Sequence, residues 1–205
     1  MFTGIITDVA TLVAASPTPA GREFVVRSAY AGITDGESIA CDGVCLTVRE
    51  SGAGTFTVAA VTTTLERTTL GAWTAGRRIN TERSMALGDR LGGHLVAGHV
   101  DTVADVTRVA PYGDALLVDL ALGAEWMPLM VPHGSIAVNG VSLTVNELLD
   151  GGVQISLIEY TLRHTMLGDL RAGDRVNVEA DLVGKYVQQL AAAHLPSAIS
   201  HLPSA

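Results

Sequence analysis

The chain has 205 residues, 48% of them hydrophobic, and a net charge of −8 with only 13 lysine and arginine residues. This length allows one large domain or two small ones, each with its own core. The acidic balance argues against a surface for nucleic acid or for an anionic membrane, and no uninterrupted apolar run approaches the length of a membrane span.

The first elements expected along the chain are short strands separated by turn residues. Loose alternation predicts a strand over residues 2–13 and a second strand over residues 22–27, with a turn rich in Pro, Ala and Gly between them. The opening Met-Phe-Thr-Gly-Ile-Ile has no basic segment and no leader-length apolar run. We therefore expect no signal peptide.

The next stretch, Gly36–Val48, holds an Asp-Gly turn followed by a strongly alternating strand. In its last five residues, Val, Leu and Val fall on one face, and Cys45 and Thr47 fall on the other. Two interpretations of the polar face stay open. It belongs either to an ordinary half-solvated strand or to a strand that contacts a ligand.

This stretch recurs as His133–Val145, at an offset of 97 residues, with Ser142 in place of Cys45. The same offset aligns residues 64–71 with 161–168 and residues 75–82 with 172–179. One register over three blocks indicates a tandem duplication. We therefore expect two related sites, similar in shape but unequal in chemistry.

Further strands are expected at residues 55–61 and 77–83, with a short helix between them for which Thr64 is a candidate N-cap. Five or six short strands per repeat predict an all-β protein. The predicted architecture is a tandem duplication of a six-stranded antiparallel Greek-key barrel. Residues 1–89 would form the N-terminal barrel and residues 90–181 the C-terminal barrel.

A C-terminal α-helix is expected over residues 182–194, followed by a disordered tail at 195–205. Its apolar stripe either packs on its own barrel or serves as an association element. The stripe consists of Leu182, Val183, Tyr186, Val187 and Leu190.

The two cysteines, Cys41 and Cys45, are four positions apart. Within one extended strand they would lie about 13 Å from each other, which is beyond the reach of a disulfide. Free thiols are typical of a reducing compartment, so the cytoplasm is the expected location.

The joint order of several motifs resembles riboflavin synthase of the alpha-subunit type. They are Met-Phe-Thr-Gly-Ile at the start, Gly-Val-Cys-Leu-Thr-Val, Gly-Gly-His-Leu-Val-Ala-Gly-His-Val-Asp and Gly-Val-Ser-Leu-Thr-Val, and the likeness extends over about residues 1–190. It implies a homotrimer of two-barrel subunits that converts two 6,7-dimethyl-8-ribityllumazine molecules into riboflavin and 5-amino-6-ribitylamino-pyrimidinedione. No metal and no redox cofactor is implied. Catalysis would occur where the N-terminal barrel of one subunit meets the C-terminal barrel of another, and lumazine synthase is a further candidate partner.

The implied chemistry removes a proton from the 7-methyl group of one lumazine and makes the second lumazine electrophilic. It therefore calls for a general base and a nucleophile. Cys45 is the candidate nucleophile and His99 the candidate base or proton relay, with Ser142 as the third catalytic candidate. For His94 we favour a structural role.

The resemblance also implies substrate contacts from both repeats. In and near the first repeat they are Phe2, Thr3, Gly4, Ile5, Ile6, Ser38, Leu46, Thr47, Thr62, Thr63, Thr64, Gly98 and Val100. In the second repeat they are His133, Leu143, Thr144, Ser156, Ile158, Tyr160, Thr161 and Asp181. His133 departs from the lysine common in the family, and Thr63 and Tyr160 replace acidic or other polar residues, which alters the expected ribityl contacts.

Two alternatives come from other functional classes. Lumazine- and flavin-binding antenna proteins share the two-barrel fold without turnover, but they tend to lose the Cys and the Gly-His pair that are present here as Cys45 and Gly98-His99. A flavin oxidoreductase barrel would need a nicotinamide site, and no Gly-x-Gly-x-x-Gly fingerprint follows a predicted strand.

Overall fold

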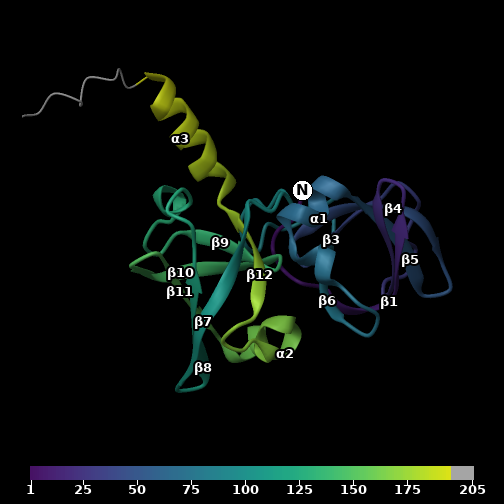
Figure 1. The fold of residues 1–205 in the computed structure, drawn as a ribbon, viewed down its shortest axis with the longest axis horizontal. Helices are drawn as coiled ribbons and strands as arrows, with labels where there is room; N and C mark the ends of the chain where they lie inside the picture. Colours follow the sequence, from purple (N-terminus) through teal and green to yellow (C-terminus); the bar gives the residue numbers. More distant parts are fainter. Residues whose placement is uncertain (195–205) are drawn as a thin grey trace, which may run out of the picture.

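The computed structural model describes residues 1–194 as two closed antiparallel barrels side by side (Figure 1). The first barrel consists of β1 (Asp8–Thr18), β2 (Gly21–Arg27), β3 (Ser38–Cys41), β4 (Val44–Gly52), β5 (Thr55–Val61) and β6 (Arg78–Arg83). The second consists of β7 (Thr102–Tyr112), β8 (Ala115–Ala121), β9 (Ser135–Val138), β10 (Val141–Leu149), β11 (Gly152–Leu157) and β12 (Arg175–Ala180).

The two barrels have the same strand order. Around the first it runs β1-β2-β5-β4-β3-β6 and closes from β6 to β1; around the second it runs β7-β8-β11-β10-β9-β12. Because β5 returns to pair with β2 beyond the β3–β4 hairpin, the order is of the Greek-key type. The predicted duplication of a six-stranded antiparallel barrel is confirmed.

The period-2 pattern places the core as expected. Along β4 the side chains of Val44, Leu46 and Val48 are buried inside the barrel, whereas Cys45 is half-buried and Thr47 is exposed. Strand β10 repeats this burial pattern residue by residue. Each strand then has an irregularity in its pairing, between positions 48 and 50 in β4 and between 145 and 147 in β10.

Three local predictions are wrong. The first strand begins at Asp8, because residues 2–6 leave the barrel and run toward the other repeat, where Phe2 forms a bridge with Val96. It also continues to Thr18, through the first part of the predicted turn. Thr64 is not an N-cap. Helix α1 (Thr62–Arg67) begins two residues earlier without a side-chain cap, and the Thr64 carbonyl accepts a hydrogen bond from the Thr68 hydroxyl.

The remaining short helices precede the last strand of a barrel or follow β8 or β11. Those that precede the last strand are η1 (Thr69–Ala72) and η3 (Met166–Asp169), η2 (Met127–Leu129) follows β8, and α2 (Glu159–His164) follows β11.

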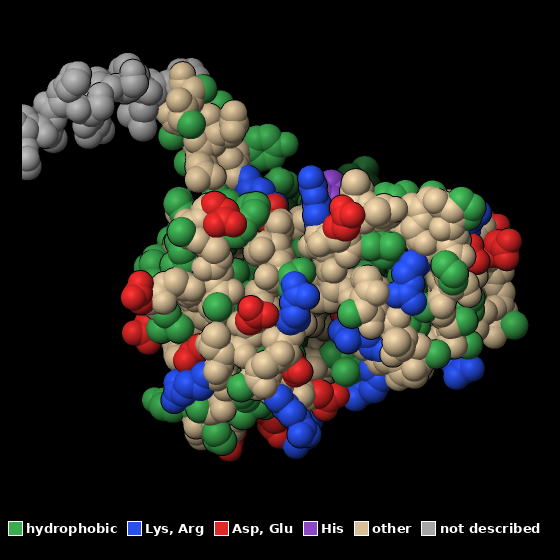
Figure 2. All heavy atoms as spheres, in the orientation of Figure 1, with side chains coloured by type: hydrophobic (Ala, Val, Ile, Leu, Met, Phe, Trp, Pro, Cys, Tyr) green, Lys and Arg blue, Asp and Glu red, His purple; other side chains and the backbone are tan. Residues whose placement is uncertain are grey.

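The C-terminal helix is present as α3 (Leu182–His194), which rises away from the second barrel (Figure 1). Its first turn is fixed by an ion pair of 2.6 Å between Lys185 Nζ and Asp101. On the same helix, Val183, Tyr186 and Val187 are 58–64% exposed, and hydrophobic side chains are visible on it in Figure 2. No helix in the described part of the chain is long and apolar enough to cross a membrane. The tail predicted as disordered lies outside the described residues.

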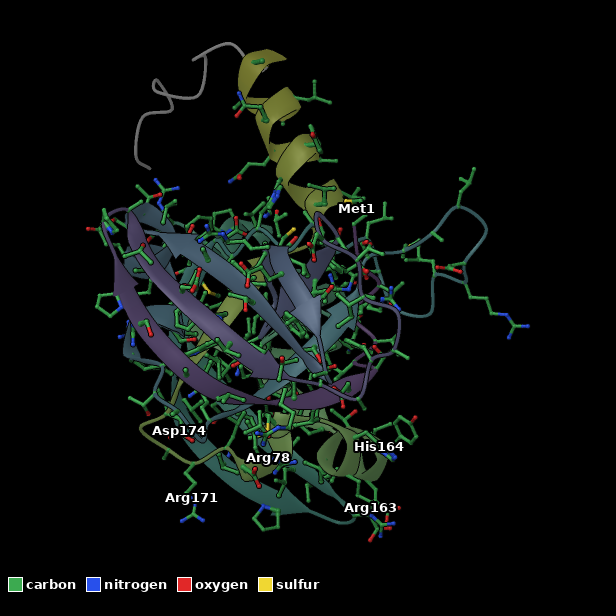
Figure 3. All side chains as sticks on the ribbon, turned by 90° about the vertical axis from the view of Figure 1, so that its right-hand side faces the viewer. Met1, Arg78, Arg163, His164, Arg171 and Asp174 are labelled. Carbon is green, nitrogen blue, oxygen red and sulfur yellow. The ribbon has the colours of Figure 1, made fainter. Side chains whose placement is uncertain are left out.

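Two buried asparagines at matching repeat positions join the barrels. Asn80 Nδ2 donates to the carbonyl of Asn139 at 3.0 Å, and Asn177 Nδ2 donates to the carbonyl of Asp42 at 2.8 Å. Because each contact is the repeat image of the other, the interface between the barrels has an approximate internal two-fold symmetry. Figure 3 shows Met1 at the end of the barrels from which α3 rises, with Arg78 and Asp174 at the opposite end.

Candidate active site

The segments that precede the first strand of each barrel, residues 2–6 and 96–100, lie against each other between the barrels. We call them the entry segments. The Phe2 N–H donates to the Val96 carbonyl at 2.8 Å, and the Val96 N–H donates to the Phe2 carbonyl at 3.1 Å. The Phe2 side chain is fully buried in this contact.

Each entry segment contacts the barrel to which it does not belong. Ile6 packs against the core of the second barrel, and Val100 packs against the core of the first. The carbonyl of Gly4 accepts a hydrogen bond of 2.8 Å from the backbone N–H of Ser142. The N-terminal entry segment therefore forms part of the polar strand face of the second barrel.

The reciprocal contact brings the Gly-His pair to Cys45. The Gly98 carbonyl accepts a 2.8 Å hydrogen bond from the backbone N–H of Cys45, and the Gly98 α-carbon lies close to both the Cys45 side chain and the Phe2 ring. His99 follows directly, with its side chain exposed. Two catalytic candidates, 54 positions apart in the sequence, thus come from neighbouring segments of the fold.

Two buried carboxylates at matching repeat positions hold the entry segments in place. Glu82 accepts hydrogen bonds from the Thr3 N–H, the Thr3 hydroxyl and the Gly4 N–H at 2.7–2.9 Å. Glu179 accepts hydrogen bonds from the three consecutive backbone N–H groups of residues 97–99, also at 2.7–2.9 Å. Burial raises the pKa of both carboxyl groups, while these donors oppose the rise. Each entry segment is therefore fixed through its backbone.

The second barrel has a cavity of about 420 Å³ on the polar face of β10. Ser142, Thr144 and Asn146 line it from that strand, and Ile5 closes one side from the N-terminal entry segment. The other lining residues are Gly92, Gly93, Ser135, Leu143, Ser156, Ile158 and Thr161. Neutral hydroxyl and amide groups of this kind suit a polar, uncharged ligand.

The first barrel presents the matching polar groups in the same register. Ser38 pairs with Thr47, and Ala40 pairs with Cys45, as Ser135 pairs with Thr144 in the second barrel. The two strand pairs thus offer the same arrangement of small polar side chains, with a thiol in one barrel where the other has a hydroxyl.

The Lumazine binding domain family matches this chain twice, over residues 3–84 and 97–181. The chain is 42% identical over 198 residues to riboflavin synthase of Brucella abortus (strain 2308), a match that covers 93% of this chain and 98% of that protein. The chain belongs to the riboflavin synthase family. Riboflavin synthase of Bacillus subtilis (strain 168) is 39% identical over 191 residues, covering 91% of this chain and 88% of the relative.

Among solved structures, the fold matches LumP complexed with riboflavin, with a TM-score of 0.80, and LumP complexed with 6,7-dimethyl-8-(1'-D-ribityl) lumazine, with a TM-score of 0.78. Both matches cover 88% of this chain and 99% of LumP at 23% sequence identity. At this identity the likeness establishes the shared two-barrel fold.

Within this riboflavin synthase family fold, the residues expected to contact substrate fall into three groups. Those that line the second cavity are Ile5, Ser142, Leu143, Thr144, Ser156, Ile158 and Thr161. Those at the matching positions of the first barrel, or in helix α1 after strand β5, are Ser38, Leu46, Thr47, Thr62, Thr63 and Thr64. Those held inside or beside the entry segments are Phe2, Thr3, Gly4, Ile6, Gly98 and Val100.

Three further expected contacts lie outside the lining of the second cavity. His133 is exposed in a turn with φ of 62°, and its backbone N–H donates to the Val145 carbonyl. The Tyr160 ring is exposed and stacks on His164, with ring centroids 4.0 Å apart. The Asp181 carboxylate accepts from the backbone N–H of Val183 at the start of α3.

Two residues at the second cavity have positions that the sequence analysis does not predict. Asn146 lines the cavity because it continues the two-residue spacing of Ser142 and Thr144 along β10. His94 lies behind the cavity, and its Nδ1 is 2.7 Å from the Ser142 hydroxyl oxygen. Burial lowers the pKa of His94, and the negative charge of Asp181 opposes this shift.

Both cysteines are free thiols in the structure. Cys41 is fully buried in the first core and its pKa is raised, chiefly by that burial, whereas Cys45 is half-buried on the polar face. Of the two, only Cys45 is therefore placed for chemistry with a ligand. Within residues 1–194, no group of three or more His, Cys, Asp or Glu side chains is placed to hold a metal ion.

Proposed function

We propose that the protein is a riboflavin synthase that converts two molecules of 6,7-dimethyl-8-ribityllumazine into riboflavin and 5-amino-6-ribitylamino-pyrimidinedione. A four-carbon unit passes from one substrate molecule to the other, so the atoms balance without a further reactant. The observation that carries the proposal is the pair of matched polar strand faces, one per barrel, in a chain related over nearly its full length to riboflavin synthases.

The side chains around these faces suit the two halves of the reaction. We assign one lumazine to the polar face of each barrel. Cys45 is the nucleophile that makes the acceptor electrophilic, and His99 is the base or relay for the proton of the 7-methyl group. Support for this pairing comes from the 2.8 Å hydrogen bond between the Cys45 N–H and the Gly98 carbonyl, which holds the backbone before His99 against β4.

The test is turnover with 6,7-dimethyl-8-ribityllumazine as the only substrate, with EDTA present and no cofactor added. Riboflavin should form, with two lumazine molecules consumed for each riboflavin. A protein that binds the lumazine, with quenched or shifted fluorescence, but forms no riboflavin would instead be an antenna-type binding protein and would contradict the proposal.

We further propose a homotrimer in the cytoplasm, with lumazine synthase as a candidate partner. The apolar side chains of Val183, Tyr186 and Val187 face solvent on a helix that projects from the barrels, a pattern typical of an association surface. Free Cys41 and Cys45 suit a reducing compartment. The three helices would meet around one axis, and the catalytic sites would form between subunits.

Replacing both Val183 and Val187 with lysine should break the trimer into monomers, because two charges on each helix would have to be buried at the axis. Turnover should fall with assembly while the barrels stay folded. Sedimentation velocity and circular dichroism measure the two effects. Gln188→Lys, an exposed polar position on the same helix, is the control and should stay trimeric. A fully active trimer of the double variant would exclude α3 from assembly.

The Cys45→Ser variant separates binding from chemistry at the position where the repeats differ. One atom changes with little change in volume, so we expect lumazine affinity to fall by no more than a few-fold, about 1 kcal/mol or less. Turnover should fall by about tenfold or more, since serine at neutral pH is a weaker nucleophile without an activating base. Ser142→Cys should not restore turnover in that background. Wild-type turnover of Cys45→Ser would identify the thiol as a packing residue.

A further inference from the structure

His94 is placed directly behind the cavity of the second barrel. It is 8% exposed, its backbone N–H donates to the Thr3 carbonyl at 3.1 Å, and its Nδ1 lies 2.7 Å from Ser142 Oγ. The preceding residue is glycine, and a β-carbon there would lie 2.6 Å from the Cβ of Ser142. Gly93 therefore allows the backbone to approach Ser142 closely enough for the imidazole to reach the hydroxyl.

The surroundings of the imidazole decide which nitrogen carries the proton. The Nε2 atom of His94 is buried and has no hydrogen-bond partner among residues 1–194. A buried N–H without an acceptor is costlier and rarer than a buried lone pair without a donor. The proton is accordingly assigned to Nδ1, and this N–H donates to Ser142 Oγ.

Burial also favours the neutral ring. The pKa of His94 is lowered by desolvation, against the opposing charge of Asp181. A protonated imidazole would carry a second N–H at the position where no acceptor is found. With Nδ1–H fixed as the donor, the Ser142 hydroxyl oxygen accepts the hydrogen bond from His94. The hydroxyl proton of Ser142 is then free to donate to another group.

Ser142 lines the cavity, so that proton is available to a ligand there. The other barrel has no equivalent arrangement. Its counterpart Cys45 is a half-buried free thiol, which is a weaker donor than a hydroxyl. The difference between the repeats is therefore larger than one atom, because the donor of the second site is also hydrogen-bonded to an imidazole.

We propose that His94 is a positioning residue that makes Ser142 a fixed hydrogen-bond donor to the ligand in the second barrel. The ligand must then place an acceptor, a ring nitrogen or a carbonyl oxygen, opposite Ser142. This inference rests on the proposed function only in naming 6,7-dimethyl-8-ribityllumazine, a heteroaromatic compound with such acceptors, as the ligand.

The test is a double-mutant cycle between His94→Leu and Ser142→Ala in the full chain, read by lumazine binding under fluorescence titration. His94→Leu alone should weaken binding at one class of site by about tenfold, the value of one oriented hydrogen bond. In the Ser142→Ala background the same change should have almost no further effect, because the group that His94 orients is gone. Equal losses in both backgrounds, or wild-type affinity of His94→Leu, would overturn the proposal.

Two polar replacements keep the proposal testable if the leucine variant does not fold. The side-chain amide of His94→Asn can take the place of Nδ1–H and should retain most of the affinity. His94→Gln places its amide nearer the position of Nε2 and should lose affinity as the leucine variant does. The reverse order would contradict the proposal. Since the readout is binding, a protein that binds lumazine without forming riboflavin would refute the proposed function and leave the role of His94 standing.

Discussion

Replacing Phe2 with alanine should lower turnover by about a hundredfold while leaving both barrels folded. The ring is fully buried among Ala40, Val96 and Ala137 with Cys45 beside it, so one side chain fills the contact that both barrels share. Its loss opens a cavity that costs about 3–5 kcal/mol. The cavity lies beside Cys45, so the two entry segments lose their common support. A displacement of about 1 Å at the reacting groups is enough for a loss of about a hundredfold in turnover.

The measurement is turnover at a temperature where circular dichroism shows a folded protein, together with the thermal midpoint. Phe56→Ala is the control, because that ring is equally buried but belongs to the core of the first barrel and not to the cluster around Phe2. It should lose comparable stability and far less activity. Equal turnover of Phe2→Ala and the wild type would show that the entry segments do not need this contact.

Gly98→Ala should cause the second large loss. Gly98 has φ of +79°, a left-handed conformation that costs a residue with a β-carbon about 1–2 kcal/mol. The added methyl group would also lie 2.7 Å from the Cβ of Cys45 and 2.9 Å from the Phe2 ring. The segment must move away, which breaks the hydrogen bond to Cys45 and displaces His99. We expect turnover to fall by about a hundredfold.

Gly54→Ala provides the matched control for this prediction. Gly54 has nearly the same φ, +76°, but no atom lies within 4 Å of its added β-carbon. The control therefore carries the backbone strain without the collision. It should lose stability by about 1 kcal/mol and keep its turnover. If both glycine variants lost activity equally, backbone strain alone would account for the effect at Gly98.

The repeated strand could be predicted from the sequence, because period-2 alternation and an Asp-Gly or Asn-Gly turn are local signals. Those signals placed Cys45 and Ser142 at corresponding positions in two barrels, and the structure has this arrangement. The helical spacing after residue 181 was equally local, and α3 forms there.

The exchange of entry segments could not be predicted in this way. The contacts that cross between the repeats join Gly4 to Ser142 and Gly98 to Cys45, which are 138 and 53 positions apart in the chain. Alternation alone extended the first strand into residues 2–7, since apolar residues there serve a contact between barrels. The contact of His94 with Ser142 could not be predicted either, because the two residues are 48 positions apart in the chain.

The central claim is that the two barrels hold the two substrate molecules of one reaction. Thr47 and Thr144 are exposed counterparts on the two polar strands, so tryptophan at either position should block one site and spare the other. Thr47→Trp and Thr144→Trp should each be inactive alone as trimers, while each retains lumazine binding at its unblocked barrel.

The most direct measurement mixes these two variants, allows their subunits to exchange, and follows riboflavin formation. If the N-terminal barrel of one subunit works with the C-terminal barrel of another, random mixing leaves about a quarter of the sites without either block. We expect recovery of about that fraction of wild-type turnover. Activity of either variant alone, or no recovery after demonstrated subunit exchange, would contradict it.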